Sequence, residues 1–228
     1  NQDGTWRVPF DPRFSEHNTT DYTEGNAFQW AWFVPQDVDG LMQLMGGKTS
    51  FIANLDRLFS TSSELTGGVV SEDISGMIGQ YAHGNEPSHH ITHLYNFVGE
   101  PWKTQNLTDE IMRTLYFNNP NGLAGNEDCG QMSAWYVLNA MGFYSFCPGD
   151  SNYSIGRPLF EEVKIKLPNN AFFTVIAKNN NSKNKYIQSA KLNGKPMNKP
   201  FFSHNDILKG GILEFEMGAT INKQVFTN

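Results

Sequence analysis

The sequence predicts an α+β protein with helices over residues 1–150 and strands over residues 151–228. Apolar residues recur at helical spacing as far as Met141, and from about residue 143 the apolar period changes to two. A run of helices followed by a run of strands is typical of α+β proteins. Paired helices with long loops at one end suit an α/α barrel. Because the five predicted helices cannot close such a barrel, we expect the missing helices to lie upstream.

Each predicted helix has an apolar stripe, and most have a start or stop signal. Gly46–Gly47 ends the first helix, and Thr49 or Ser50 caps the second. Pro87 fits the first turn of the third, and Gly142 ends the fifth. The fifth helix is apolar on most of its circumference, which predicts burial on several sides. The predicted helices cover residues 38–45, 51–59, 87–98, 108–117 and 130–141.

The second part carries the alternation of apolar and polar residues that is typical of half-buried strands. Val163, Ile165 and Leu167 alternate with lysines, and the apolar residues of Leu213–Met217 alternate with glutamates. Asn193–Gly194 predicts a type I′ hairpin turn. With further strands expected over residues 172–177 and 186–192, this part is predicted to form a small antiparallel, β-sandwich-like segment.

Composition and charge exclude several classes of protein. With 39% hydrophobic and 18% charged residues, the chain is too apolar to be disordered. The net charge is −6 and no run of Lys or Arg is present, so no nucleic-acid partner is expected. No apolar stretch is long enough to span a membrane. The chain begins at Asn1 without a visible signal peptide, so we expect a fragment or a processed product. Cys129 and Cys147 are interpreted either as free thiols or as one disulfide.

The first loop that contains candidate catalytic residues covers residues 21–30. It places Glu24 among Tyr22, Phe28 and Trp30. Aromatic rings that desolvate a carboxyl raise its pKa, which suits a general acid near neutral pH. The alternative interpretation is a surface glutamate beside a helix start, stabilised by the helix dipole.

The second loop, residues 83–93, holds four of the six histidines. His89 and His93 have the i, i+4 spacing of a zinc pair, but His90 stands where the metalloprotease motif requires glutamate. Asn85 and Glu86 precede a helix that starts with proline, and their oxygens suit a hard cation or sugar hydroxyls. In a purely structural interpretation the histidines bond loop carbonyls and Glu86 caps the helix.

The third loop, residues 122–133, places the adjacent Glu127 and Asp128 just before the fifth helix. In an extended segment the two side chains point to opposite sides, so only one can face a substrate. The alternative interpretation is that Asp128 caps the helix. Together the three loops supply carboxylates, histidines, amides and aromatic rings. This combination suits glycoside hydrolysis, in which one carboxyl protonates the leaving oxygen and another acts as base or nucleophile.

The segments 22–47, 79–105 and 122–165, with the motifs YTEGN, GNEPSHH and GNEDCG, resemble glycoside hydrolase family 92. Members of this family are calcium-dependent, exo-acting α-mannosidases, many of them bacterial and acting on α-1,2 linkages. The similarity runs from about Tyr22 to about Val163 and continues loosely through the strands. Since family members are much longer, the resemblance implies a C-terminal portion of the enzyme.

The resemblance implies part of an (α/α)6-barrel catalytic domain, an upstream β-sandwich domain, inversion at the anomeric carbon and a calcium ion at the sugar. By similarity Glu24 matches the general acid and Asp128 matches the general base. Asn85 and Glu86 are expected to bind the calcium. The implied partners are a mannose-containing oligosaccharide or N-glycan and the N-terminal part of the same enzyme, and the implied location is periplasmic or secreted.

Further substrate contacts are expected from residues of all three loops: Trp30, Glu86, His89, His90, Asn126 and Glu127. Some family members carry an acid where this chain has Asn126. If that acid positions the attacking water, the amide would weaken the base assembly.

Two other kinds of function fit the same residues. One is an α/α-barrel glycosidase of other specificity or a disaccharide phosphorylase, in which phosphate replaces the general base and turnover depends on phosphate. The other is a non-catalytic carbohydrate-binding fragment, which a mannose-release assay would separate from an enzyme.

Overall fold

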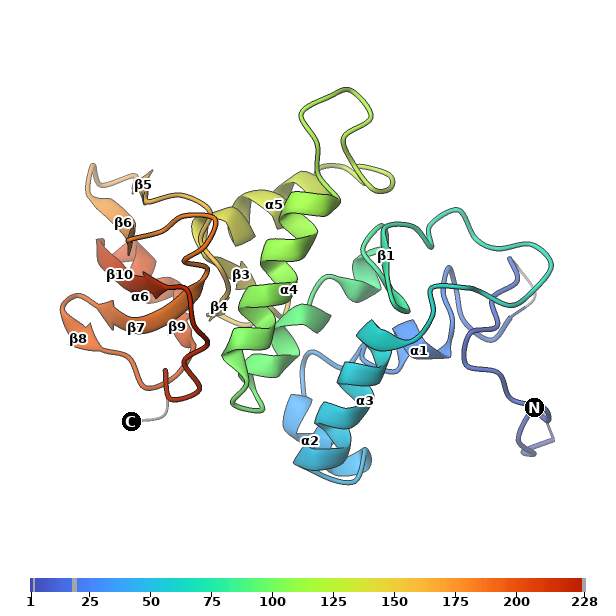
Figure 1. Cartoon of the computed structure of the whole chain (residues 1–228). Coiled ribbons are helices and arrows are strands. Elements are labelled where there is room, and N and C mark those ends of the chain that lie inside the picture. Colours follow the sequence, from blue (N-terminus) through green and yellow to red (C-terminus); the bar gives the residue numbers. More distant parts are fainter. Residues whose placement is uncertain (2, 18–19, 227–228) are drawn as a thin grey trace.

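Helices come first along the chain and most strands come last, as the periodicity predicts. The computed structural model describes residues 1, 3–17 and 20–226. Figure 1 shows the helical elements at the centre and one side of the molecule and the later strands at the other side. The helical part contains α1 (Ala27–Trp30), α2 (Val38–Leu44), α3 (Lys48–Ser60), β1 (Met77–Ile78), β2 (Tyr81–Ala82), the 3₁₀ helices η1 (Glu86–Ser88) and η2 (Ile91–Asn96), α4 (Pro101–Thr114) and α5 (Gln131–Met141).

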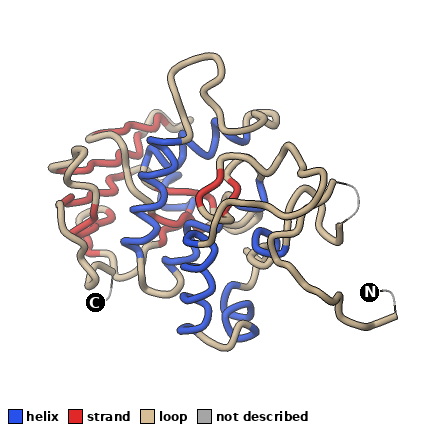
Figure 2. The backbone as a smooth tube through the Cα atoms, turned by 45° about the vertical axis from the view of Figure 1, so that its right-hand side comes forward, coloured by secondary structure: helices blue, strands red, loops and turns tan. Residues whose placement is uncertain are grey.

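The strands after α5 form a five-stranded sheet in the order β5-β6-β10-β7-β8 and a three-stranded sheet in the order β3-β4-β9. Figure 2 shows these strands gathered at one end of the molecule. The larger sheet is mixed: β10 runs parallel to β6, whereas the other strand pairs after α5 are antiparallel, so the antiparallel prediction fails at this one pair. The elements are β3 (Phe143–Ser145), β4 (Asn152–Ile155), β5 (Glu162–Lys166), β6 (Phe172–Lys178), β7 (Tyr186–Leu192), β8 (Lys195–Pro196), β9 (Phe201–Ser203), α6 (His204–Leu208) and β10 (Gly211–Gly218).

Several predicted boundaries are confirmed and others move. α5 ends at Gly142, and Asn193 and Gly194 both adopt the left-handed backbone of a type I′ turn, with φ of 51° and 78°. α3 begins at Lys48 with Gly47 as its N-cap, so the capping prediction for Thr49 or Ser50 is wrong. α4 begins at Pro101 rather than near residue 108. The smaller sheet pairs β3 with β4 across residue 150.

The predicted third α-helix is wrong, because residues 86–96 form two short 3₁₀ helices. Their backbone bonds close over three residues, as from the His93 N–H to the His90 carbonyl at 3.0 Å. Every residue of η2 is buried, and the side chains of His93, Tyr95 and Asn96 bond to other elements. In addition, the Thr104 hydroxyl of α4 donates to the main-chain carbonyl of Thr92 at 2.8 Å. Tertiary hydrogen bonds therefore override the α-helical pattern of this segment.

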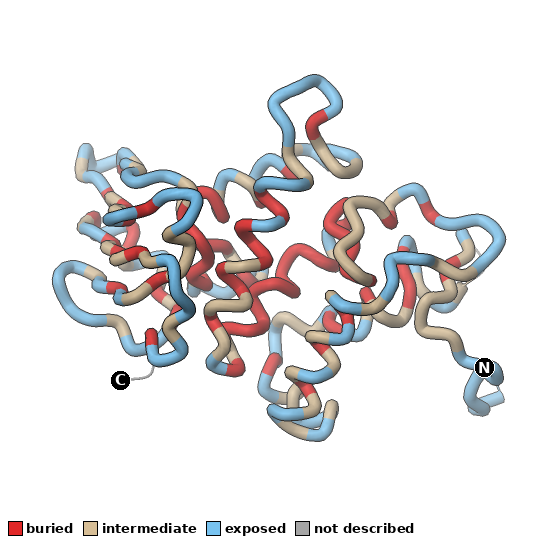
Figure 3. The backbone as a smooth tube through the Cα atoms, in the orientation of Figure 1, coloured by how far each residue is buried: buried red, intermediate tan, exposed pale blue. Residues whose placement is uncertain are grey.

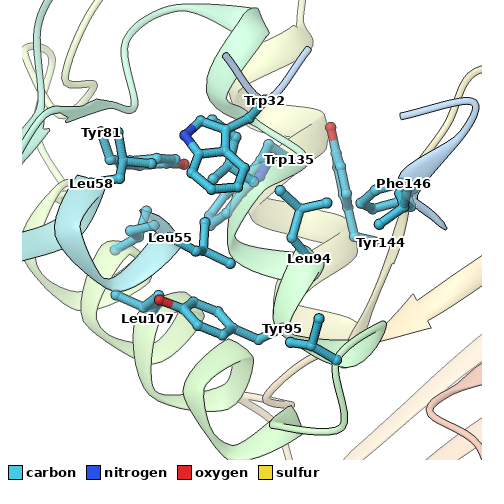
Figure 4. Packing of buried hydrophobic residues seen from close by; sticks show 14 of the residues in the cluster. Trp32, Leu55, Leu58, Tyr81, Leu94, Tyr95, Leu107, Trp135, Tyr144 and Phe146 are labelled. Atoms are coloured by element: carbon cyan, nitrogen blue, oxygen red, sulfur yellow. The ribbon is translucent and has the colours of Figure 1, made fainter. Parts of the chain in front are cut away.

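The chain has two apolar cores, one in the helical part and one in the sheet part, and α5 contributes side chains to both. The first core joins α2, α3, η2, α4 and one face of α5. Figure 4 shows Trp32, Tyr81 and Trp135 beside Leu55 and Leu58 in this core. The second core lies between the two sheets and reaches Leu138 and Met141 of α5. α5 is therefore buried against two cores, but its remaining side is exposed, with Val137 54% accessible, so it is not buried on most of its circumference.

Buried polar contacts join the helical part to the sheets. The Arg157 guanidinium lies after β4 and is 1% exposed, and its Nε is 3.0 Å from the Asp109 carboxylate of α4. The backbone N–H of Ile187 in β7 donates to the Gln105 side chain of α4 at 2.9 Å. These contacts fix α4, and through it the helical core, against the larger sheet.

Candidate active site

The first loop holds Glu24 on a left-handed backbone, with φ of 51°, immediately before α1. A capping box starts that helix: the Asn26 side chain accepts from the Gln29 N–H, and the Gln29 side chain accepts from the Asn26 N–H. Glu24 is exposed, so the predicted desolvation by neighbouring rings is not seen in this chain. The Trp30 indole N–H is instead committed to the Thr23 carbonyl at 2.8 Å, which braces the loop backbone.

Asn85 of the second loop connects this loop to the first one. Its amide N–H group donates to the Glu24 carbonyl at 2.9 Å and lies 3.5 Å from the Glu24 carboxylate. Its carbonyl oxygen accepts from the Glu86 N–H at 3.0 Å, so Asn85 caps η1 and the alternative role of Glu86 as the cap is wrong. The Glu86 carboxylate is exposed and makes no hydrogen bond to any described residue.

Glu86 lies at the edge of a pocket of about 390 Å³. Burial raises the pKa of Tyr144, which also lines this pocket, to about 12, and the nearby negative charge of Glu86 adds to the increase. The pocket is lined mainly by aromatic, histidine and apolar side chains from α5, from β3 and the residues after it, from the segment before α2 and from residues 86–90: Phe33, Pro35, Glu86, His89, His90, Gln131, Ala134, Trp135, Leu138, Tyr144, Ser145, Phe146 and Pro148. Aromatic faces beside a carboxylate suit a pyranose ring, whose apolar face stacks and whose hydroxyls bond.

The four histidines of the second loop are buried and uncharged. Burial lowers the pKa of His89, His90 and His93 to about 4, and it lowers the pKa of His83 well below its ordinary value. A carbonyl only accepts, so His89 Nε2 donates to the His83 carbonyl at 3.0 Å and His90 Nε2 donates to the Trp32 carbonyl at 2.7 Å. These bonds fix the neutral tautomer of both rings.

The zinc interpretation of His89 and His93 does not fit this arrangement. Both ring nitrogens of His93 are used, Nδ1 with the Ser154 hydroxyl and Nε2 with the Asn139 carbonyl oxygen, each at 3.0 Å. His89 Nδ1 accepts from the Gln131 amide at 3.0 Å. Within residues 1, 3–17 and 20–226, no group of three or more His, Cys, Asp or Glu side chains is placed to hold a metal ion.

Calcium needs a fuller shell of oxygens than these residues provide, since it takes six to eight ligands. The exposed Glu86 carboxylate fits the role of one ligand. The Asn85 carbonyl oxygen already accepts a hydrogen bond and would offer only its second lone pair.

The third loop presents Asp128 through an unusual backbone. Asp128, Cys129 and Gly130 all have left-handed φ values, of 51°, 56° and 97°. Gly130 is the N-cap of α5, so the capping role considered for Asp128 is wrong. The Glu127 carboxylate does the capping instead, since it accepts from the Ser133 N–H at 3.1 Å and from the Ser133 hydroxyl at 2.9 Å. Asp128 and Asn126 are exposed, and both cysteines are free.

The three loops meet around residues 84–89. Asn85 binds Glu24 of the first loop, as described above. Gly125 of the third loop packs so closely on Gly84 that a Cβ atom at Gly125 would lie 3.0 Å from the Gly84 Cα atom. Gln131 links the start of α5 to His89. Figure 3 shows that the loop between α4 and α5 is mostly exposed.

Sequence reasoning missed the site residues Gln131 and Tyr144. Gln131 follows the GNEDCG motif directly, and Tyr144 is an aromatic residue just after the end of α5. Their positions next to a chemical motif and a helix stop were the available signals. Sequence reasoning also missed the left-handed backbone at Glu24 and Asp128: aspartate is enriched in this conformation and is a weak signal, whereas glutamate is none.

Residues 1–219 match the model of the glycosyl hydrolase family 92 catalytic domain. The chain belongs to this family. The resemblance drawn from its motifs is therefore confirmed. A curated relative described as an uncharacterized secreted glycosidase of Arthroderma benhamiae is 32% identical over 204 residues, which cover 88% of this chain.

Solved structures of family 92 mannosidases are also similar. An α-mannosidase of Bacteroides thetaiotaomicron in complex with mannoimidazole is 39% identical with a TM-score of 0.91, and the match covers all of this chain and 30% of that one. An inverting mannosidase of Bacteroides thetaiotaomicron is 38% identical with a TM-score of 0.82, covering 99% of this chain and 31% of that one. The chain spans 24% of the curated relative. None of the helices in the described part of this family 92 chain has the length and apolar character needed to cross a membrane.

Proposed function

We propose that this family 92 chain belongs to an exo-acting glycoside hydrolase that releases terminal α-linked mannose, with inversion and with α-1,2 linkages preferred. The observation that carries the proposal is the backbone of Glu24 and Asp128. Among the acidic side chains of the described residues, these two alone have a left-handed φ. Such strain in a non-glycine residue is costly and concentrates at functional sites.

The proposed chemistry needs one proton donor and one proton acceptor. Asp128 takes a proton from water while the water oxygen bonds to the anomeric carbon. Glu24 gives its proton to the glycosidic oxygen as the bond between that oxygen and the anomeric carbon breaks. The products are mannose of inverted configuration and the alcohol of the leaving group. Inversion requires a gap of roughly 6.5–9.5 Å between the two carboxyls, which admits the water.

The pocket beside Glu86 is the proposed place of the terminal mannose. His90 carries its Nε2 proton toward the Trp32 carbonyl, which leaves Nδ1 as an acceptor for a sugar hydroxyl. Glu86 is the proposed calcium ligand, and Asn85 is proposed as a second ligand through its remaining lone pair. A bound calcium ion would polarise vicinal hydroxyls and favour a distorted sugar ring.

Three further proposals concern the rest of the enzyme, its location and its substrate. We propose that an N-terminal part of the same enzyme completes the barrel, since Trp6, Leu44 and Val137 present apolar surface that is 91%, 89% and 54% exposed. An extracytoplasmic location is proposed from the curated relative, which is described as secreted. The proposed natural substrate is a mannose-containing oligosaccharide or N-glycan.

The proposal is tested on the complete enzyme with α-1,2-mannobiose followed by proton NMR. The first mannose released should be the β-anomer. Release of the α-anomer would exclude inversion, and release only in the presence of phosphate would favour a phosphorylase.

Chelation tests the calcium proposal. Excess EDTA should abolish mannose release, and calcium should restore it better than magnesium, which demands a tighter octahedral shell. In parallel, calorimetric titration should show weaker calcium binding for Glu86→Gln than for the matched exposed variant Glu110→Gln. Full activity in excess chelator, or equal calcium binding by both variants, would argue against Glu86 as a ligand.

A further inference from the structure

Glu127, the residue before the proposed base, makes contacts that differ from those its sequence position predicts. Glu127 precedes Asp128, and the sequence assigns it to the substrate. In the structure both of its carboxylate oxygens are used within the chain, one by the Ser133 N–H and one by the Ser133 hydroxyl. Such a carboxylate has little capacity left for a sugar.

The Glu127 carboxylate accepts hydrogen bonds from the first turn of α5. The N-cap Gly130 has no side chain and so offers no acceptor to the N–H groups of the first turn; those of Gln131 and Met132 bond main-chain carbonyls, and that of Ser133 needs another acceptor. Ser133 is the third residue of α5, and a negative charge is favourable at a helix N-terminus. Glu127 therefore replaces the missing capping side chain from outside the helix.

The segment between Glu127 and the helix is held in an unfavourable conformation. Asp128 and Cys129 are consecutive non-glycine residues with left-handed φ. Main-chain bonds from Met132 to the Glu127 carbonyl at 3.3 Å and from Gln131 to the Asp128 carbonyl at 3.2 Å fold this segment onto the first turn of α5. The Asp128 carboxylate forms no hydrogen bond or ion pair with any described residue, although it lies close enough to His89 to interact with that ring electrostatically, so its place depends mainly on this backbone.

We propose that Glu127 is a positioning residue that clamps the 128–130 segment to α5 and so fixes where the Asp128 carboxylate stands. This inference rests on the proposed function only in giving Asp128 its role as base. The clamp also reaches the second loop, because the first turn that it holds carries Gln131, which bonds His89.

Cys129 offers a readout that needs no activity, because this exposed thiol lies within the clamped segment. In the complete enzyme, alkylation of Cys129 by iodoacetamide is followed by mass spectrometry of its peptide. Glu127→Ala should speed this alkylation, since the segment loses its anchor. Glu110→Ala removes an exposed carboxylate of α4 that bonds no described residue, and it should leave the rate unchanged.

Kinetics separate positioning from substrate contact. Glu127→Ala should lower kcat by about 10²-fold with an unchanged KM, the scale expected when a reacting group is displaced by about 1 Å. Glu127→Gln keeps an acceptor for the Ser133 N–H and a donor for its hydroxyl, so it should recover most of that loss. Ser133→Ala keeps the N–H bond and should fall between the wild type and Glu127→Ala.

Two results would overturn the clamp. A raised KM with unchanged kcat and unchanged Cys129 alkylation in Glu127→Ala would make Glu127 a substrate contact. A Gln variant as inactive as the Ala variant, again with unchanged alkylation, would make its charge part of the chemistry. Failure of the proposed function has a different signature, because Asp128→Asn would then keep full activity while the alkylation measurement still reports on the clamp.

Discussion

The helical part and the sheet part bury different kinds of side chain. The helical part buries a polar network that includes all four histidines of the second loop, together with Asn26, Gln29, Gln80 and Asn139. In the sheet part the buried polar residues among those described are Ser154, Arg157 and Asn180, and the core is made mainly of Phe, Ile, Leu and Val, with Ala and Met. The network fixes directions, because a hydrogen bond is directional and a buried polar group left unpaired is costly. The sheet core supplies stability without such constraints.

The largest effect that separates the two parts is expected from acid. His89, His90 and His93 have pKa values of about 4 in the folded chain, below the ordinary 6.5. Between pH 6.5 and about 4 the unfolded chain therefore binds protons that the folded chain does not. The free energy of unfolding is highest above pH 6.5 and falls through this window by up to about 1.4 kcal/mol per pH unit for each histidine.

All five tryptophans lie in the helical part, so their fluorescence reports this unfolding directly. Denaturant titrations at several pH values should show the fall. His93→Gln should reduce the slope of the free energy of unfolding against pH. His204→Gln, which changes an exposed histidine of α6, should leave that slope unchanged. If the free energy of unfolding stayed constant from pH 6.5 to 4, the buried histidines would not distinguish the helical part from the sheet part.

A second effect belongs to the sheet. Phe215 of β10 is fully buried and packs near Gly142 at the end of α5. Phe215→Ala should lower the free energy of unfolding by about 3–5 kcal/mol. Below its unfolding transition, the complete enzyme carrying this change should keep its kcat, because no group of the candidate site moves. Phe172→Ala is the matched control, since Phe172 is 49% exposed and should cost little. A large loss of kcat in folded Phe215→Ala would show that the sheet also tunes the site.

The smallest effect is expected at the hairpin turn between β7 and β8. Gly194 has a φ of 78°, and a Cβ atom there would meet nothing within 4 Å. Gly194→Ala should therefore cost only the backbone strain, about 1 kcal/mol, in a urea titration. Mannose release should be unaffected. An unchanged stability would mean that the turn relaxes to another type.

Sequence alone predicted the elements that depend on local patterns. The stop at Gly142, the Asn193–Gly194 turn and the alternating strands β5, β6, β7 and β10 follow from glycine geometry and periodicity, and all are confirmed. The 3₁₀ conformation of residues 86–96 could not be predicted, because tertiary hydrogen bonds decide the backbone of this segment. The parallel pairing of β6 and β10 joins strands far apart in sequence, so no local pattern encodes it.

The candidate site was predicted in part. The motifs predicted the loops, and the structure brings these loops together at Asn85 and Gly84; of the three predicted carboxylates Glu24, Glu86 and Asp128, only Glu86 lines the pocket of about 390 Å³. The capping bond of Glu127 and the bridging bonds of Asn85 could not be read from spacing. They depend on the reversal of the chain at residues 128–130 and on contact between loops 61 residues apart.

The central claim is that Glu24 and Asp128 perform different halves of the reaction, and leaving-group dependence tests it most directly. In the complete enzyme, Glu24→Gln should lose about 10²–10⁴-fold on a mannobiose and keep much of its activity on a mannoside with an activated phenol, which leaves without protonation. Asp128→Asn should lose activity severely and similarly on both substrates, because both need an activated water, and added azide should partly restore it. If Glu24→Gln were equally inactive on both substrates while Asp128→Asn spared the activated one, the two assignments would be contradicted.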